Sequence, residues 1–286
     1  MKTLLSLLCI LISLVATAQT SEQTAAQVVG MIKTNVGVEW REPTVDAFKA
    51  GDSNAVVTGI AVTMMSTLDV LQRAAAMGDN FIITHEPTFY NHPDATEPLA
   101  NEHDPVYEAK QAFIRDHRLI IWRFHDHWHR RNPDGIHQGM MRALGWNQFQ
   151  DKEMPFVFHL PLTTLKSLAL DIKAKLGIHA LRVFGDSNAA VSTVGISEGF
   201  GGFDLNRRIL RATGVDVLVL GEAHEWETIE YGTDAAAEGN RKGLIILGHI
   251  PSEQAGMEEC SEWLKTFVTG VPIHFVPAKE PFWIAE

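Results

Sequence analysis

Phe81-Ile82-Ile83-Thr84-His85-Glu86 decides the fold of this chain. A short apolar run that ends in a polar pair predicts a buried strand with a possible site at its carboxyl end. Two later segments repeat this pattern, namely Ile121-Trp122-Arg123-Phe124-His125 and Ile246-Leu247-Gly248-His249. Because the carboxyl ends of strands form the ligand crevice of open α/β sheets, we expect the three segments to bring their histidines together.

The rest of the chain alternates short apolar runs with longer segments of helical period, which is the pattern of an α/β fold. The expected strands are residues 55–62, 81–84, 119–124, 156–160, 191–196, 215–220 and 244–247. The expected helices are residues 67–77, 106–116, 136–144, 164–176, 205–213, 228–238 and 253–268. The periodicity breaks near residues 147–154, which indicates a boundary between two α/β lobes.

The N-terminus has the pattern of a secretion signal. Lys2 precedes the apolar run Leu4–Val15, and the small residues Ala16-Thr17-Ala18 follow it. We therefore expect cleavage near Ala18 and export to the periplasm or out of the cell. The apolar run is shorter than the roughly 20 residues that a membrane-spanning helix needs, so we expect no membrane association.

Composition narrows the class of partner. Without Lys2, 23 of the 24 basic residues remain against 35 acidic ones, a net charge of −12, which disfavours a nucleic-acid-binding surface. Cys260 would be the only cysteine left after cleavage, so no intrachain disulfide can form.

His125-Asp126-His127-Trp128-His129 contains three histidines at alternate positions. An extended segment would send all three imidazoles to one side, whereas a helical turn would bring His125 and His129 together. Either arrangement presents at least two imidazoles to one ion. Three histidines beside an apolar strand favour metal binding over a polar surface loop.

Carboxylates accompany the other two histidines. In Gly248-His249-Ile250-Pro251-Ser252-Glu253 we expect Ser252 to cap a helix and Glu253 to lie in its first turn. Glu253 then either complements the helix dipole or bridges two cations. The pair His85 and Glu86 ends a buried strand, where it is costly unless it is metal-bound or forms a structural salt bridge.

Two other site types receive less support. The glycine-rich stretch 199–202 lacks both the Gly-x-Gly-x-x-Gly pattern and a Gly-Lys-Ser/Thr ending, so we interpret it as a turn and not as a phosphate loop. A lactamase-like metallohydrolase would use His125-x-His127, but the chain lacks the Asp-His pair that this pattern places after its second histidine.

A series of motifs runs in order from about Val56 to the C-terminus. It comprises Thr58-Gly59-Ile60-Ala61-Val62, Phe81 to His85, His125 to Gly135, Gly221-Glu222 with Glu225, Gly248-His249 with Ser252-Glu253, and Pro281-Phe282. In order and spacing the chain resembles the Nif three-like proteins with a dinuclear metal centre, also named the type 2 GTP cyclohydrolase I family.

The resemblance implies a set of six metal ligands. The family uses two adjacent histidines, a His-x-x-x-Asp segment and a His-x-x-x-Glu segment. By position these are His85 with Glu86, His125 with His129, and His249 with Glu253. Glu86 stands where the family has its second histidine, and His129 stands where it has aspartate. The exchange is reciprocal and keeps the total of imidazoles and carboxylates, which favours retained metal binding with a different mix of donors at each ion.

The resemblance also implies an architecture. It predicts two α/β lobes with mixed sheets and a metal cleft between them, two divalent ions per chain (zinc, manganese or iron), and a ring-shaped hexamer. The first lobe would comprise residues 19–146, completed by residues 250–286, and the second lobe residues 147–249.

Two functions follow as hypotheses. The first is a metal-dependent hydrolase of a small molecule, in which Glu253 bridges the ions. His127, Glu222, His224 and Glu225 are then candidates for proton transfer or for support of the ligands. The second is a non-catalytic metal-binding or scaffold protein outside the cytoplasm, whose closed site would leave no position for water or substrate.

Overall fold

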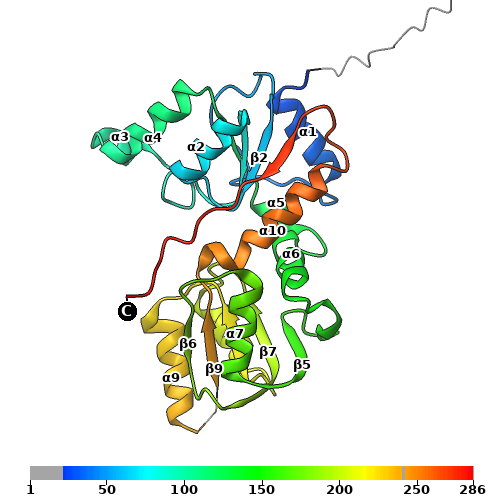
Figure 1. Cartoon of the computed structure of the whole chain (residues 1–286), viewed down its shortest axis with the longest axis vertical. Helices are drawn as coiled ribbons and strands as arrows, with labels where there is room; N and C mark the ends of the chain where they lie inside the picture. The colour runs from blue at the N-terminus through cyan, green and yellow to red at the C-terminus, as the bar shows by residue number, and fades with distance from the viewer. Residues whose placement is uncertain (1–21, 240–241, 286) are drawn as a thin grey trace, which may run out of the picture.

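The computed structural model describes residues 22–239 and 242–285, which form two lobes, each built on a five-stranded mixed sheet (Figure 1). The predicted α/β class with mixed sheets is confirmed. The predicted secretion signal, residues 1–18, lies outside the described residues. None of the helices in the described ranges is long and apolar enough to cross a membrane.

The sheet of the first lobe has the strand order β1-β4-β3-β2-β10. Its strands are β1 (Phe48–Ala50), β2 (Ile60–Thr63), β3 (Phe81–Thr84), β4 (Ile120–Arg123) and β10 (Ile273–Phe275). All pair in parallel except β1, which runs antiparallel to β4. Every residue of β2, β3 and β4 is buried, as expected for parallel strands covered on both faces.

The first lobe also contains helices, most of which contribute apolar side chains to a core shared with this sheet. They are α1 (Ala25–Asn35), α2 (Leu68–Met77), α3 (Glu97–Asn101), α4 (Pro105–Asp116) and α5 (Asp126–Arg130). Val28 and Ile32 of α1 and Leu71 of α2 are fully buried in this core. Thr24 begins α1 with a capping box, because its hydroxyl accepts from the Gln27 amide while the Gln27 side chain accepts from the Thr24 amide.

The sheet of the second lobe has the order β5-β7-β8-β9-β6. Its strands are β5 (Val157–Thr164), β6 (Arg182–Phe184), β7 (Ala190–Ser197), β8 (Val217–Leu220) and β9 (Gly243–Ile246). The inner strands β7, β8 and β9 are parallel, and the edge strands β5 and β6 are antiparallel to their neighbours. The lobe also contains η1 (Asn147–Phe149), α7 (Leu165–Leu176), α8 (Gly202–Leu210), η2 (Glu225–Ile229) and α9 (Glu230–Ala237).

Two helices, α6 (Gly135–Leu144) and α10 (His249–Leu264), lie where the lobes meet (Figure 1). Their backbones touch, because a Cβ atom on Gly256 would lie 2.4 Å from the Cα of Ile136 and one on Gly139 would lie 2.5 Å from the Cα of Gly256. Helix α10 follows β9 of the second sheet, and its buried residues Met257 and Leu264 belong to the core of the first lobe. It therefore joins the two lobes.

The start of α10 corrects one prediction. The helix begins at His249, so Ser252 is not its N-cap and Glu253 lies in the second turn. Pro251 permits the earlier start, because the first helical turn needs no amide donors. The Ser252 hydroxyl accepts from the amide of Gly199 at 3.0 Å and donates to the carbonyl of His249 at 2.7 Å.

We expect Gly256→Ala to destabilise the fold by about 1–3 kcal/mol, because the added methyl group meets backbone that cannot move aside. Urea unfolding measures the change. Gly30→Ala on α1 is the matched control, since a Cβ atom there meets nothing within 4 Å. Equal unfolding free energies for the two variants would contradict the close contact between α6 and α10.

Candidate metal centre

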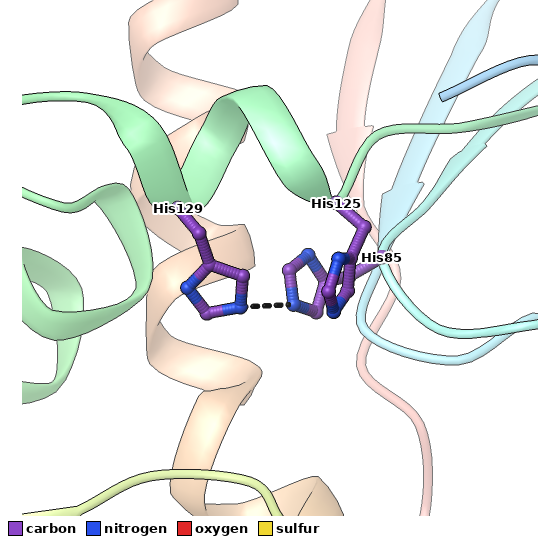
Figure 2. A group of neighbouring side chains, drawn as sticks. All are labelled: His85, His125 and His129. Atoms are coloured by element: carbon purple, nitrogen blue, oxygen red, sulfur yellow. Dashed lines mark hydrogen bonds between the residues drawn. The ribbon is translucent and has the colours of Figure 1, made fainter. Parts of the chain in front are cut away.

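The ends of β3 and β4 bring the first histidines together. The two strands pair in parallel with Thr84 opposite Arg123, so His85 and His125 follow them at the same edge of the sheet. Helix α5 then turns the chain so that the imidazole of His129 lies beside that of His125. Of the two arrangements that the sequence left open, the structure has the helical one, and Figure 2 shows the three imidazoles facing one another.

All six predicted ligand residues lie in one cluster. The Nε2 atoms of His85 and His129 are 3.2 Å apart, and the rings of His85 and His125 are 4.6 Å apart. Two overlapping groups could each hold a metal ion: His85 with His125 and His129, and His85 with Glu86 and Glu253. Within each group the potential ligand atoms lie within 4.8 Å of one another.

His249 completes the cluster from α10. Its Nε2 atom lies 3.4 Å from Glu86 Oε1 and 3.2 Å from Glu253 Oε2. Glu86 Oε1 is also 3.6 Å from His125 Nε2. Glu86 and His129, the two residues that depart from the family pattern, therefore lie beside the other predicted ligands.

Each imidazole of the cluster is oriented by an acceptor on its outer nitrogen. The Nδ1 atoms of His85, His125, His129 and His249 meet the carbonyl of Phe124 at 3.1 Å and the carboxylates of Asp126, Asp134 and Glu222 at 2.9, 2.9 and 2.8 Å. These acceptors favour a proton on Nδ1. They leave the Nε2 lone pairs for a cation, which is the usual arrangement around metal-binding histidines.

Glu253 places a buried carboxylate oxygen in the interior of the cluster. Glu253 Oε2 is buried without a hydrogen bond, although His249 Nε2 and His85 Nε2 lie 3.2 and 3.5 Å away. The Nε2 atoms of His85 and His129 form a hydrogen bond at 3.2 Å, so a proton lies between two nitrogen atoms that could instead bind a cation. A buried acceptor without a donor is costly, and a divalent cation would satisfy Glu253 Oε2. The residues present therefore fit a metal ion.

Burial and charge set the pKa values of the metal-free cluster. Burial, with the nearby His125 and His129, lowers the pKa of His85 well below its usual value, so this imidazole is neutral. Burial also raises the pKa of Glu253. For His249, burial acts to lower the pKa, but the adjacent carboxylates of Glu222, Glu253 and Glu86 raise it to about 12. The carboxylates thus hold a positive charge in the cluster.

Arg123 contacts two residues of the cluster and was not predicted as a site residue. Its buried side chain donates from Nε to the carbonyl of His85 at 2.9 Å and from Nη2 to Glu86 Oε2 at 3.4 Å. Arg123 therefore fixes the backbone of His85 and the carboxylate of Glu86, two of the predicted ligands. A guanidinium inside an otherwise apolar strand was the sequence signal for this role.

Asp46 also escaped prediction. Its buried carboxylate accepts from the amides of His125, Asp126 and His127 at 2.6, 2.9 and 2.9 Å, and from the Nδ1 atom of His127 at 2.7 Å. It thus holds the first turn of α5, which carries His125 and His129. No local motif links residue 46 to this turn.

Of the four predicted supporting residues, the structure places one in contact with the cluster. Glu222 contacts the cluster through His249. His127 points away, because Asp46 engages its Nδ1 atom and the Arg41 amide donates to its Nε2 atom at 2.9 Å. His224 lies 3.3 Å from Glu227, and Glu225 pairs with Arg182 at 2.9 Å. The structure therefore does not bring His127, His224 or Glu225 into contact with the ligands.

We expect Glu222→Gln to weaken metal binding by about 10-fold, because the partners that orient metal-binding histidines contribute about 10–100-fold to affinity. Competition with a chromophoric chelator measures the affinity. Glu225→Gln is the control, since it removes an equal charge three residues away without a contact to His249. Identical affinities for the two variants would show that Glu222 does not position the ligand.

Known proteins share this fold and sequence pattern. A family model described as Duf34/NIF3 (NGG1p interacting factor 3) matches residues 33–281. A GTP cyclohydrolase 1 type 2 homolog from Clostridium perfringens (strain 13 / Type A) is 24% identical over 241 residues, which cover 80% of this chain and 86% of that protein.

Solved structures agree in fold. The Bacillus cereus protein related to NIF3 matches with a TM-score of 0.71 at 14% identity, and Staphylococcus aureus protein SA1388 matches with a TM-score of 0.70 at 19% identity. Each match covers 92% of this chain and 99% of the other. The resemblance predicted from the sequence motifs is confirmed: the chain belongs to the Duf34/NIF3 family.

Proposed function

We propose that this protein holds two divalent metal ions per chain at a dinuclear centre and uses them to hydrolyse a small molecule. The observation that carries the proposal is the clustering of four imidazoles and two carboxylates, among which Glu253 Oε2 is a buried oxygen without a hydrogen bond. Six donors exceed the four that a single structural zinc ion takes.

Glu253 is the residue best placed to bridge two ions. Its Oε2 atom lies 3.2 Å from His249 Nε2 and 3.5 Å from His85 Nε2, and these two histidines follow strands of different lobes. Glu86 similarly faces both His125 and His249. Mixed imidazole and carboxylate donors suit zinc, manganese or iron.

Solvent access favours hydrolysis over a closed, non-catalytic site. The side chains of His125 and His249 are 19% and 21% exposed, so the cluster opens on one side. A bound pair of divalent ions supplies Lewis acidity, which polarises a carbonyl or phosphoryl oxygen and acidifies water. Glu222, half exposed and hydrogen-bonded to His249, is placed to exchange protons with solvent.

Two measurements test the proposal in sequence. Metal analysis of protein purified without chelator or added metal is expected to give close to two ions per chain, and metal-free protein would refute the centre. Phosphoesters, small peptides, cyclic amides and GTP are then screened with added manganese or zinc. Loaded protein that turns over none of them would favour the non-catalytic metal-binding or scaffold function.

We expect the double variant Glu86→His with His129→Asp, which restores the family pattern, to change metal selectivity. The change moves one imidazole and one carboxylate between positions, so each ion meets a different set of donors. Competition among zinc, manganese and iron, followed by elemental analysis, reads the preference. Unchanged metal content and selectivity would contradict the assignment of these two residues as ligands.

The proposal extends to location and assembly. The signal-like N-terminus supports export to the periplasm or out of the cell, and the family resemblance supports a ring-shaped hexamer. Mass spectrometry of the mature N-terminus is expected to show cleavage near Ala18. Light scattering is expected to give six times the mass of one chain, and a monomer would refute the hexamer.

A further inference from the structure

A cavity of about 590 Å³ lies against the metal cluster. His249 and Glu222 form part of its wall, so it adjoins the ligands directly. Most of the remaining wall is apolar and comes from Met65, Ile246, Leu247, Ile250, Pro281 and Phe282, with Trp283 and Ile284. This volume and lining are typical of pockets for small organic molecules.

The C-terminal strap, residues 276–285, closes one side of the cavity. It leaves the first lobe after β10, where the Val276 amide donates to the carbonyl of Val62 at 2.8 Å and Arg73 donates to the carbonyl of Pro277 at 2.6 Å. Figure 1 shows it running from that lobe toward the other. There Glu280 accepts from the amides of His179 and Ala180 at 2.6 and 2.9 Å.

Glu280 therefore fixes the strap just before its aromatic residues. Phe282 and Trp283 follow within three positions, and Trp283 is 78% exposed although it lines the cavity. Large exposed aromatic side chains at the rim of a cavity gain free energy when a ligand covers them. An anchor directly before the aromatic residues also lowers the conformational entropy that they lose on binding, compared with a wholly free tail.

We propose that this cavity is the substrate pocket, and that it selects small molecules with a planar aromatic or heteroaromatic group attached to the polar group that reaches the metal cluster. The inference rests on the proposed dinuclear function. Continuity with His249 and Glu222 identifies the occupant as a small molecule, because one end of the pocket is polar and reactive while the other is apolar and aromatic.

Phosphonates test the inference without a known substrate. Phenylphosphonate and methylphosphonate share a metal-binding head group and differ in the ring, and cyclohexylphosphonate adds bulk without a planar π system. Calorimetry on manganese-loaded, full-length protein is expected to show phenylphosphonate binding about tenfold more tightly than the other two. Trp283→Ser is expected to reduce this preference to about twofold.

Trp226→Ser is the matched control, because Trp226 is 69% exposed and is not part of the cavity wall. It should keep the full preference. Equal affinities for the three phosphonates in the unaltered protein would overturn the inference while leaving a metal-dependent centre in place. Binding of none of them would also overturn it, and metal analysis of the same sample shows whether the dinuclear centre fails as well.

Light scattering on the same variants tests whether a second copy of the chain, and not a small molecule, contacts the strap. If Trp283→Ser dissociates an oligomer and leaves the preference for phenylphosphonate unchanged, the strap is a contact between copies of the chain and the pocket assignment is wrong. An unchanged oligomeric state together with the lost preference supports the assignment.

Discussion

Glu253→Gln is expected to reduce metal content from the proposed two ions per chain to one or none, with affinity at least about 100-fold weaker. The expectation exceeds the 10–100-fold effect of residues that only orient ligands, because Glu253 itself contributes the buried oxygen. The amide keeps the shape of the side chain and removes its negative charge. In the proposed dinuclear centre, two cations would then lose the anion that offsets their repulsion.

The metal-free protein separates this effect from misfolding. Burial raises the pKa of Glu253, so its carboxylate is unfavourable without a cation, and the glutamine variant should be at least as stable as the unaltered apoprotein. Only the stabilisation gained on adding metal should be lost. Glu258→Gln, an exposed change on the same helix, should leave both measurements unaltered. Full metal content in Glu253→Gln would remove Glu253 from the ligand set.

Asp46→Ala is expected to lower the free energy of unfolding by about 3–5 kcal/mol, the range for breaking a buried pair of charged or polar partners. The change leaves three backbone amides and the Nδ1 atom of His127 without their acceptor. Urea unfolding measures the loss. Metal affinity should fall in parallel, because the turn that presents His125 and His129 loses its anchor.

Two control variants test this prediction. Asp46→Asn keeps one acceptor oxygen and should lose less stability than the alanine variant. Asp52→Ala removes an exposed carboxylate that accepts from the amide of Asn54 in a local turn, and it should cost less than about 1 kcal/mol. Similar losses for Asp46→Ala and Asp52→Ala would show that Asp46 does not organise the turn.

The central strands could be predicted from sequence because their signal is local. In β3 and β4 a run of apolar residues defines the strand, and the polar residue that follows marks its carboxyl end. Parallel pairing then places His85 beside His125, which needs only the rule for α/β sheets. The predicted ligand positions therefore rest on strand ends and on the resemblance together, and the structure places these residues in one cluster.

Short elements escaped prediction because distant contacts define them. The strands β1, β6 and β10 have three residues each, too few for a periodic pattern. Helix α5 has five residues and is held by Asp46 from another part of the chain. The helix α1 lies just after the predicted secretion signal, and no helix was expected there.

The supporting residues of the site could not be predicted either, because they too depend on contacts between distant parts of the sequence. Arg123 and Asp46 act on the ligands through contacts between segments separated by tens of residues. The alternation His125, His127 and His129 did not reveal which imidazole turns away, because a helical and an extended segment give opposite answers. Pro251 likewise allowed α10 to begin earlier than the Ser252 signal indicated.

The place of β10 in the first sheet has a consequence for biosynthesis. Ile273 pairs with Ile60, a residue made 213 positions earlier. Until residues 273–275 leave the ribosome, one edge of β2 has no partner, and its backbone offers an apolar template to any other strand. Closing so distant a pair is also slow. The nascent chain thus depends on β10, which is made long after β2, to protect its first sheet from aggregation, and this delay gives chaperones an interval in which to act.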